Sequence, residues 1–218
     1  MQGLTMSNTR GYFIVFEGCD GCGKTTQTEL LRTAITEATG RPCLYEREPN
    51  ERNAAGAIIR SGLYGGVKFL PESMAYLHVA DRLEHIEHMI PLLESGNNIV
   101  CDRYYLSNMA YNVADNLSME DIYEMNKPCI RKMKPDLFVF LDVPLDVSKK
   151  RRSNRGSDRE LYDEDDKQAK IRANYFAAIE LLTKQGEKVV VVDATQDIEA
   201  IANEIRDKVF NQLNLSQE

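Results

Sequence analysis

No apolar stretch in the 218-residue sequence approaches the roughly 20 residues that a membrane-spanning helix requires. Residues 1–10 lack the apolar core of a secretion signal, so we expect a loose polar leader and a cytoplasmic protein. Internal repeats and low-complexity segments are also absent. With 43% hydrophobic and 28% charged residues, segment 11–218 is expected to fold as one globular domain.

Positive charge is in deficit. The 27 lysines and arginines are outnumbered by 34 acidic residues, which gives a net charge of -7 and an isoelectric point near 5.2. A nucleic-acid partner or an anionic membrane surface is therefore not expected. Disulfides are not expected either, because five cysteines, an odd number, in a chain without a secretion signal indicate reduced thiols.

The strongest positive signal is a phosphate-binding loop near the N-terminus. The apolar residues 13–16 run directly into Gly18-x4-Gly23-Lys24-Thr25, and a helical pattern follows. This order aims backbone N–H groups and the positive end of a helix dipole at the phosphates of a nucleoside triphosphate. Lys24 is predicted to contact the β- and γ-phosphates, and Thr25 to ligate Mg²⁺. The predicted ATP-binding residues of the loop are Gly18, Cys19, Asp20, Gly21, Cys22, Gly23, Lys24, Thr25 and Thr26.

Two cysteines, Cys19 and Cys22, form a CxxC pair inside this loop. Zinc binding is not expected, because zinc needs a second pair or suitably spaced histidines and the sequence has no second CxxC. The pair is interpreted as two small side chains that fill loop positions. A redox switch is the alternative hypothesis, since thiols near a helix N-terminus have lowered pKa values and a disulfide would distort the loop.

Two further predicted strands end in charged residues. Strand 43–45 leads to Arg47, and strand 98–102 delivers Asp102 and Arg103. Ligand groups gather at the carboxyl ends of parallel strands, so both arginines are candidates for an acceptor phosphate and Asp102 for hydrated Mg²⁺. The alternatives are a solvated loop charge for Arg47 and a structural ion pair between Asp102 and Arg103. A polar and aromatic cluster fit to line a pocket follows, at Ser107, Asn108, Tyr111 and Asn112.

The longest predicted helix covers 71–94. His78, Arg82 and His85 share one of its faces, so a cation and an aromatic ring are placed to address one planar ligand. Metal binding by His85 and His88 is disfavoured, because no third ligand is indicated. A shorter helix is predicted over 50–60, followed by a flexible connector at 62–66.

Six basic residues lie between positions 149 and 159, against one acidic residue, Asp158. Favourable placement of cations at a helix C-terminus accounts for residues 149–152 but not for Arg155 and Arg159. A hydrophilic segment between two helices suits a lid that closes over the triphosphate and supplies arginines to the transferred phosphoryl group. The sequence therefore predicts an arginine-rich lid over about 151–163.

The rest of the chain alternates strands and helices. We predict helices at 118–133 and 198–213 and strands at 136–142 and 188–193. The expected fold is α/β, a P-loop NTPase fold with a five-stranded parallel sheet flanked by helices. A GTPase is disfavoured, because Cys129 in Asn126-Lys127-Pro128-Cys129 stands where an aspartate must read guanine.

Four blocks, in order, resemble the thymidylate kinase family, the P-loop kinases that phosphorylate dTMP to dTDP. They are 16–27 around the P-loop, Arg47-Glu48-Pro49, 80–86 with Asp81-Arg82, and 102–111 with Asp102-Arg103-Tyr104. The resemblance covers residues 12 to about 210. It implies direct in-line transfer of the ATP γ-phosphoryl group to dTMP with Mg²⁺, and a homodimer.

The resemblance also implies roles for single residues. Arg47 and Arg103 would hold the acceptor phosphate, Arg82 and Asn108 would read the thymine edge, and Tyr111 would exclude a ribose 2′-hydroxyl. The implied dTMP-binding residues are Asp20, Arg47, His78, Arg82, Arg103, Ser107, Asn108, Tyr111 and Tyr162. The implied catalytic residues are Lys24, Arg103, Asp20 and Arg155.

Three positions depart from the common family pattern: His78, Asn50, which replaces the glycine usual after Arg-Glu-Pro, and Asn112, where glutamine is common. The family usually stacks a phenylalanine on the base where this chain has His78, which is smaller and titrates near neutrality. The family places an additional arginine in the P-loop or in the lid, and Cys22 occupies the P-loop position. The resemblance thus implies the lid-arginine type, with Arg155 as first choice and Arg159 or Arg151 as alternatives, and with Arg151 and Arg155 near ATP.

Two other functions use the same P-loop. A deoxynucleoside kinase would phosphorylate thymidine rather than dTMP, and it needs a base for the neutral 5′-hydroxyl. A nucleotide-dependent switch would hydrolyse ATP slowly, whatever monophosphate is present. The absent guanine motif counts against the switch.

Overall fold

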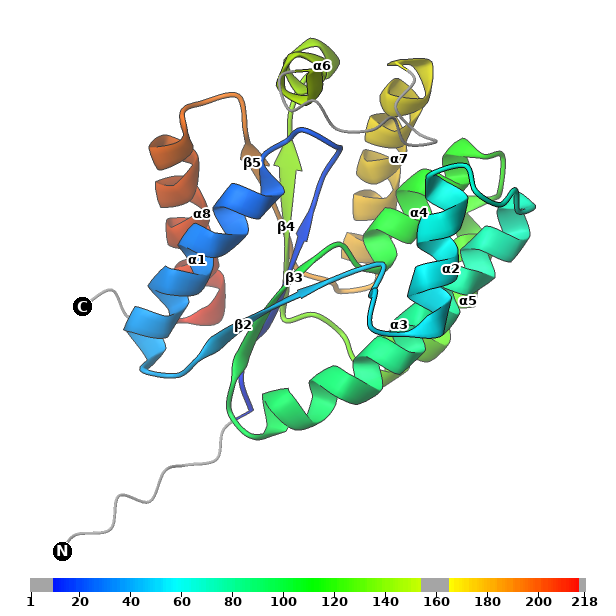
Figure 1. The fold of residues 1–218 in the computed structure, drawn as a ribbon. Helices are drawn as coiled ribbons and strands as arrows, with labels where there is room; N and C mark the ends of the chain where they lie inside the picture. Colours follow the sequence, from blue (N-terminus) through cyan, green and yellow to red (C-terminus); the bar gives the residue numbers. More distant parts are fainter. Residues whose placement is uncertain (1–9, 154–164, 216–218) are drawn as a thin grey trace, which may run out of the picture.

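The computed structural model describes residues 10–153 and 165–215 of the chain. Within these ranges five strands form one parallel sheet in the order β2-β3-β1-β4-β5 (Figure 1). The strands are β1 (Phe13–Glu17), β2 (Cys43–Arg47), β3 (Asn98–Asp102), β4 (Leu137–Asp142) and β5 (Val189–Asp193). The predicted α/β fold with a five-stranded parallel sheet is confirmed.

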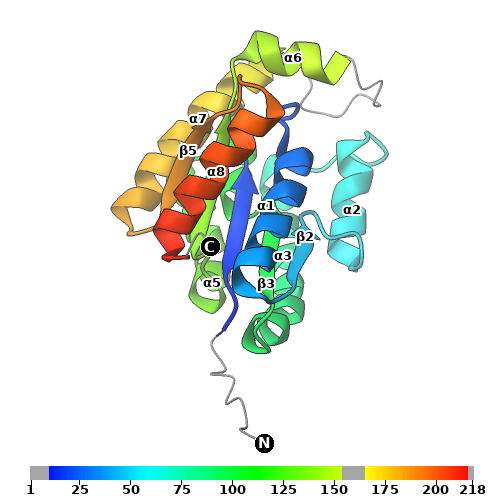
Figure 2. The ribbon, with the colours of Figure 1, turned by 90° about the vertical axis from the view of Figure 1, so that its left-hand side faces the viewer.

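Helices cover both faces of the sheet. In the described ranges they are α1 (Lys24–Thr39), α2 (Ala54–Leu63), α3 (Pro71–Glu94), α4 (Tyr105–Ala114), α5 (Met119–Lys132), α6 (Leu145–Ser153), α7 (Asp165–Lys184) and α8 (Ile198–Leu213). Helices α1 and α8 lie on one face, and α3, α4, α5 and α7 lie on the other (Figure 1, Figure 2). This arrangement explains why the central strands are continuous apolar runs rather than alternating ones.

The central strand β1 is anchored from both faces. Phe13 and Val15 pack into the apolar cluster under α3, α4 and α7, whereas Ile14 and Phe16 pack into the cluster under α1 and α8. All four side chains are fully buried. The carboxyl end of β1, where the P-loop begins, is therefore held rigidly at the middle of the sheet.

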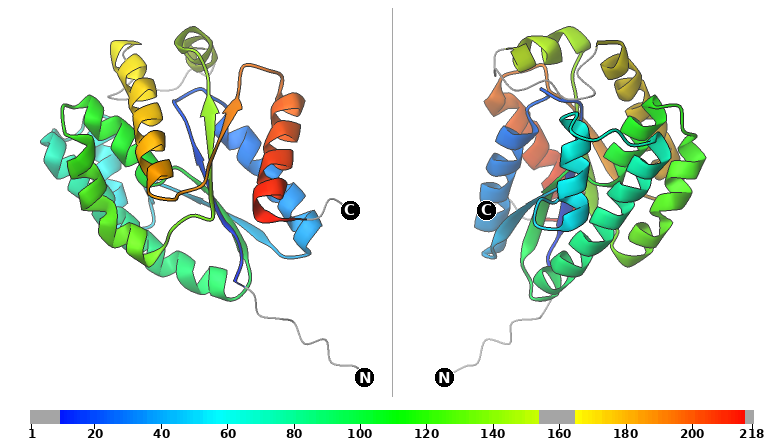
Figure 3. Two further views of the ribbon diagram at one scale, coloured as in Figure 1. Left: turned by 180° about the vertical axis from the view of Figure 1, so that it is seen from behind. Right: turned by 45° about the vertical axis from the view of Figure 1, so that its right-hand side comes forward.

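The carboxyl ends of the strands meet at one edge. Seen from behind, the arrowheads of β4 and β5 point to the end of the molecule that carries α6 (Figure 3). Because all the pairings are parallel, the residues after β1, β2 and β3 reach the same edge. Residues from distant parts of the sequence thus gather in one place.

Helix α2 differs from its predicted position at 50–60. It begins at Ala54 because the Asn53 side chain caps it, with Gly56 N donating to Asn53 Oδ1 over 2.8 Å. It continues to Leu63, so Gly62 is buried within the helix and is not part of a flexible connector. The helices predicted at 71–94 and 198–213 have those bounds.

Helix α4 was not predicted as a helix, although its residues were expected to line a pocket. It begins two residues after Arg103, so the strand-to-helix turn is short. No helix in the described ranges is both long enough and apolar enough to cross a membrane. The division into a leader and a single kinase domain stays a prediction.

Candidate active site

The P-loop joins β1 to α1 through a backbone that needs glycine. Gly18, Gly21 and Gly23 have φ values of 147°, 85° and 100°, which side chains disfavour. A Cβ atom on Gly18 would also lie 2.7 Å from the carbonyl oxygen of Leu141. Gly23 precedes α1 without a side-chain cap, so the first N–H groups of the helix are available to an anion.

Lys24 is buried and points back along its own loop. Its Nζ donates to the carbonyl oxygens of Gly18 and Cys19, over 2.9 and 3.3 Å, and lies 3.8 Å from Cys22 Sγ. Among the described residues no carboxylate forms an ion pair with Lys24. Carbonyl oxygens are weaker partners for an ammonium group than anionic oxygens, so phosphate would replace them.

The two P-loop cysteines are free, buried thiols, and Cys22 is only 1% exposed. Burial raises the pKa of Cys19 to about 12 and raises that of Cys22, although Lys24 and Arg103 oppose both shifts. The expectation of lowered pKa values was wrong, because desolvation outweighs the nearby positive charges. The redox hypothesis stays untested, and the side chains fill the loop.

Arg103 connects the end of β3 to the P-loop. Its φ is 72°, an uncommon left-handed conformation for a residue with a side chain. Its Nη2 lies 2.6 Å from Asp20 Oδ1 and 3.0 Å from Tyr111 Oη, and Nη1 donates to Ser107 Oγ over 3.0 Å. Burial disfavours the Asp20 carboxylate, but the charges of Arg103 and Lys24 outweigh it and lower the Asp20 pKa to about 2. Arg103 and Asp20 are thus a preformed ion pair.

Glu17 lies beneath this pair and was not singled out from the sequence as a site residue. It is fully buried, and its carboxyl accepts hydrogen bonds from Tyr104 N, Ser107 N and Oγ, and Tyr175 Oη. Burial raises the Glu17 pKa to about 7, against the opposing effects of Ser107 and Arg103. Glu17 therefore fastens the start of α4 and helix α7 to the end of β1.

A pocket opens beside the P-loop, between the strand ends and helices α2, α3 and α4. It is lined by every predicted acceptor-site residue that the structure describes: Asp20, Arg47, His78, Arg82, Arg103, Ser107, Asn108 and Tyr111. It is also lined by residues that were not predicted to bind ligand: Glu48, Pro49, Arg60, Leu63 and Tyr104. Four of the lining residues are arginines and two are carboxylates, a balance that suits an anionic ligand.

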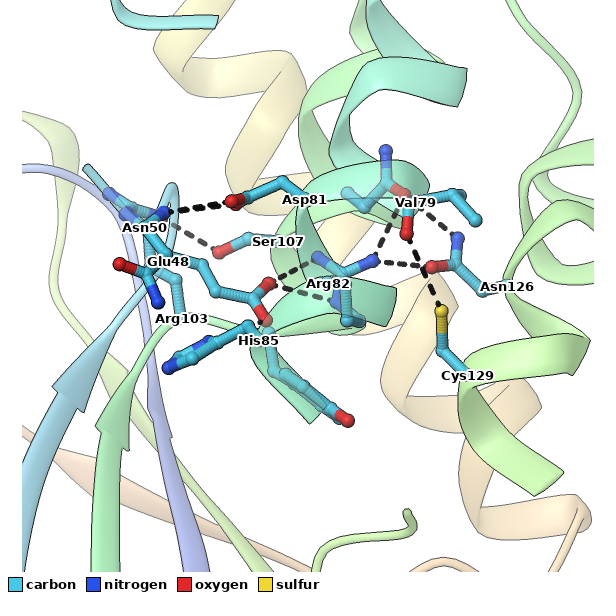
Figure 4. A network of polar contacts seen from close by, with 12 residues as sticks. Glu48, Asn50, Val79, Asp81, Arg82, His85, Arg103, Ser107, Asn126 and Cys129 are labelled. Carbon is cyan, nitrogen blue, oxygen red and sulfur yellow. Dashed lines mark hydrogen bonds and ion pairs between the residues drawn. The ribbon is translucent and has the colours of Figure 1, made fainter. Parts of the chain in front are cut away.

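Arg82 is held in place by a buried carboxylate (Figure 4). Its Nε and Nη2 lie 2.8 and 2.6 Å from Glu48 Oε2, and both side chains are at most 3% exposed. Its Nη1 donates to Asn126 Oδ1 over 2.5 Å and lies 3.4 Å from Asn108 Oδ1. Asn126 also donates to Asn108 Oδ1 over 2.9 Å. The orientation of Arg82 is therefore fixed before any ligand binds.

His85 shares a helix face with His78 and Arg82, but it does not line the pocket. Its Nδ1 lies 3.3 Å from Glu48 Oε1 and its Nε2 lies 3.0 Å from Glu46 Oε2. Burial alone would lower the His85 pKa, but the hydrogen bonds and charges of the two carboxylates outweigh it and raise it to about 9. His85 is a buried imidazolium one helical turn beyond Arg82. It bonds to the Glu48 carboxylate and so helps to hold Glu48 in place.

His78 stands in the pocket wall, half-buried. Burial and the charges of Arg82 and Arg103 lower its pKa to about 3, so the ring is neutral near pH 7. The expectation that His78 titrates near neutrality was wrong, because burial and, to a smaller extent, the nearby arginines disfavour the charged ring. A neutral imidazole can still stack on a planar base.

Thr25 and Asp102 fit a magnesium site. Thr25 is exposed in the first turn of α1. Asp102 is only 8% exposed, and its buried Oδ1 has no hydrogen-bond partner among the described residues. The alternative ion pair of Asp102 with Arg103 is not formed, since Arg103 pairs with Asp20. The described ranges hold no cluster of three or more metal-binding side chains. Such a sparse site suits Mg²⁺, which keeps waters and substrate phosphates as ligands.

The predicted lid lies largely outside the described residues, including Arg155, Arg159 and Tyr162. Their roles stay predictions. Arg151, near the end of α6, is described, and its Nη1 donates to the carbonyl oxygen of Ala194 over 2.9 Å. This bond ties α6 to the segment that follows β5.

A P-loop beside an arginine-lined pocket for a second anionic ligand defines a phosphotransferase of the P-loop kinase class. The sequence model of one family, described as thymidylate kinase, matches residues 16–205. The chain belongs to the thymidylate kinase family. It is an ATP-binding transferase of nucleotide biosynthesis.

Individual relatives agree with this family over most of their length. A probable thymidylate kinase of Pyrococcus abyssi is 35% identical over 201 residues, which cover 90% of this chain and 94% of the relative. The thymidylate kinase of Thermomicrobium roseum is 35% identical and covers 89% of this chain and 92% of its own. The thymidylate kinase of Bifidobacterium longum is 37% identical, and the match covers 88% of this chain and 93% of the relative.

Proposed function

We propose that the chain transfers the γ-phosphoryl group of ATP to the 5′-phosphate of dTMP, giving ADP and dTDP, in one in-line step. One observation carries this proposal. Asp20 belongs to the P-loop, lines the acceptor pocket and pairs with Arg103 at 2.6 Å. Asp20 thus borders both proposed sites, which supports the transfer of a phosphoryl group between two neighbouring phosphates.

On the donor side, the P-loop amides and Lys24 bind the triphosphate and stabilise the charge that develops during transfer. Thr25 and Asp102 would hold Mg²⁺, which when bound neutralises charge on the β- and γ-phosphates. We further propose that the lid over about 151–163 belongs to a single domain, 11–218, and adds Arg155 and Arg151 to this side.

On the acceptor side, Arg47 and Arg103 hold the dTMP phosphate, and Asp20 meets the deoxyribose 3′-hydroxyl. The thymine ring stacks on His78, with Arg82 and Asn108 at its edge. No general base is required, because the acceptor phosphate is already an anion that can attack. Three further residues complete the proposed site: Ser107, Tyr111, which excludes a 2′-hydroxyl, and Tyr162.

We also propose that the enzyme is a homodimer. Large apolar side chains are exposed along α2, the following connection and the start of α3: Ile58, Tyr64, Val67, Leu70 and Tyr76, with Leu70 70% exposed. Such a concentration on one side of the molecule is typical of a protein interface. Sedimentation of wild type and Leu70→Glu tests this, and a monomeric wild type would contradict it.

The function is tested by following ADP release from ATP and Mg²⁺ with dTMP, dUMP, dCMP, dGMP or thymidine added separately. Turnover that depends on dTMP, with a weaker response to dUMP, is the expected result. Phosphorylation of thymidine but not dTMP would instead identify a deoxynucleoside kinase. Slow hydrolysis that no monophosphate stimulates would point to a nucleotide-dependent switch.

A further inference from the structure

Arg60 lines the acceptor pocket from α2, and none of the roles assigned above uses it. Its side chain is 14% exposed, and its Nε lies 3.0 Å from Glu51 Oε1. Glu51 is 67% exposed, so this ion pair lies in solvent and contributes little. Glu51 therefore does not account for the position of a mostly buried cation.

The Arg60 guanidinium also has donors without acceptors. Its Nε and Nη2 are buried and make no hydrogen bond to the described residues, so the Glu51 contact is electrostatic only. Arg82 and Arg103, in the same pocket, each donate to carboxylates. A buried donor without a partner is costly and rare in native structures. An acceptor supplied by the ligand would remove that cost.

The packing of α2 on α3 shows which end of the pocket Arg60 occupies. A Cβ atom on Gly56 would lie 2.9 Å from Asp81 Oδ1, and one on Gly62 would lie 2.6 Å from Met74 Cε, so the two helices run antiparallel. Arg60 is one turn after Gly56 and therefore lies across from the turn of α3 that carries His78. Arg47, the last residue of β2, and Arg103, the first residue after β3, lie instead at the P-loop edge of the sheet.

We propose that Arg60 binds the pyrimidine base of the acceptor nucleotide, its guanidinium donating to a ring carbonyl oxygen. This inference rests on the proposed function and adds a base-recognition residue to it. The phosphate end of the pocket already has Arg47 and Arg103, whereas the base end has no unengaged donor of this strength apart from Arg60 among the described residues. The His78 ring has the stacking role in the proposed function.

Calorimetric titration of dTMP and of thymidine, which lacks the phosphate, separates a base contact from a phosphate contact. Arg60→Gln is expected to lower the affinity for dTMP and for thymidine by the same factor, about tenfold. The lost donor binds the base, which both ligands contain. Arg60→Lys keeps the charge and should recover part of the loss. Lys68→Gln removes an equal charge from an exposed site nearby and should change neither affinity.

Three outcomes overturn the inference. Unchanged affinities in Arg60→Gln would show that the residue does not contact the nucleotide, and a loss confined to dTMP would place it on the phosphate. An equal loss in Glu51→Gln, which removes only the ion-pair partner, would show a structural role. Thermal unfolding of each variant confirms that it is folded. Failure of wild type to bind dTMP even in the presence of an unreactive ATP analogue would overturn the proposed function itself, a result distinct from these three.

Discussion

The P-loop and the acceptor pocket hold their cations in different ways. Lys24 Nζ rests on two backbone carbonyl oxygens of its own loop. Arg82 and Arg103 rest on the carboxylates of Glu48 and Asp20, at 2.6 Å in both pairs.

The difference separates two tasks. An arginine paired with a carboxylate is oriented before the substrate arrives, but much of its charge is already balanced. An ammonium group on neutral carbonyls keeps its charge for the phosphates, where charge develops during transfer. The acceptor pocket therefore supplies geometry, and the P-loop supplies electrostatic stabilisation.

The largest expected effect follows from removing the P-loop charge. Lys24→Met should lower kcat by about 10³-fold, because the charge of the transition state loses a preorganised cation. The affinity for dTMP should change less than about twofold, since the acceptor ion pairs stay intact. Steady-state kinetics and dTMP titration measure the two effects. The control is Lys170→Met, an exposed lysine on α7.

Neutralising Glu48 should instead disturb the orientation of the side chains that line the acceptor pocket. Glu48→Gln leaves Arg82 and His85 buried without their shared carboxylate, which should lower the free energy of unfolding by about 3 kcal/mol. The KM for dTMP should rise at least about tenfold, with a smaller change in kcat. Glu124→Gln, at an exposed ion pair, serves as control. A variant with wild-type stability and KM would refute the supporting role of Glu48.

The charge of His85, which is bonded to Glu48, should make the stability of the fold depend on pH. Its pKa rises from 6.5 to about 9 on folding, so its stabilising contribution is complete below about pH 6.5 and is lost as pH rises through about 9. Glu46 and Glu48 bond the ring, and Arg52 and His88 lie against Glu46.

Unfolding free energies of wild type and His85→Gln at pH 6 and pH 10 measure this contribution. The difference in unfolding free energy between wild type and His85→Gln should decrease by up to about 3 kcal/mol from pH 6 to pH 10. A difference in unfolding free energy that does not change with pH would show that folding does not raise the His85 pKa.

The smallest effect is expected at His78. Because its ring is neutral, with a pKa of about 3, His78→Phe should change kcat/KM for dTMP by only a fewfold through altered stacking. The ratio of kcat/KM between wild type and His78→Phe should be constant between pH 6 and pH 9. A ratio that changes around pH 6.5 would mean that the imidazole titrates in the pocket.

The sequence was most informative where local patterns decide the structure. The P-loop motif, the buried strands and the capped, periodic helices α3 and α8 depend on neighbours in sequence, and their bounds were predicted well. Arg103 and Asp20 were both predicted site residues. Their ion pair was not predicted, because it needs the register of β1 against β3.

Other site features depend on how helices cross. Arg60 enters the pocket only because α2 starts at Ala54 and packs antiparallel on α3, whereas the sequence predicted a helix four residues earlier. His85 shares a helix face with His78, but its depth beneath Glu46 and Glu48 follows from the bend of the chain after β2. Helical periodicity gives a face, and tertiary packing decides what that face meets.

The most direct test of the central claim is calorimetric titration of dTMP into nucleotide-free wild type and Lys24→Met. If the acceptor pocket is built before ATP binds, both proteins should bind dTMP with the same affinity within about twofold. No binding by either protein until ATP or an unreactive analogue is added would contradict a preformed pocket. A large loss confined to Lys24→Met would show that the P-loop charge and the acceptor geometry are not separate.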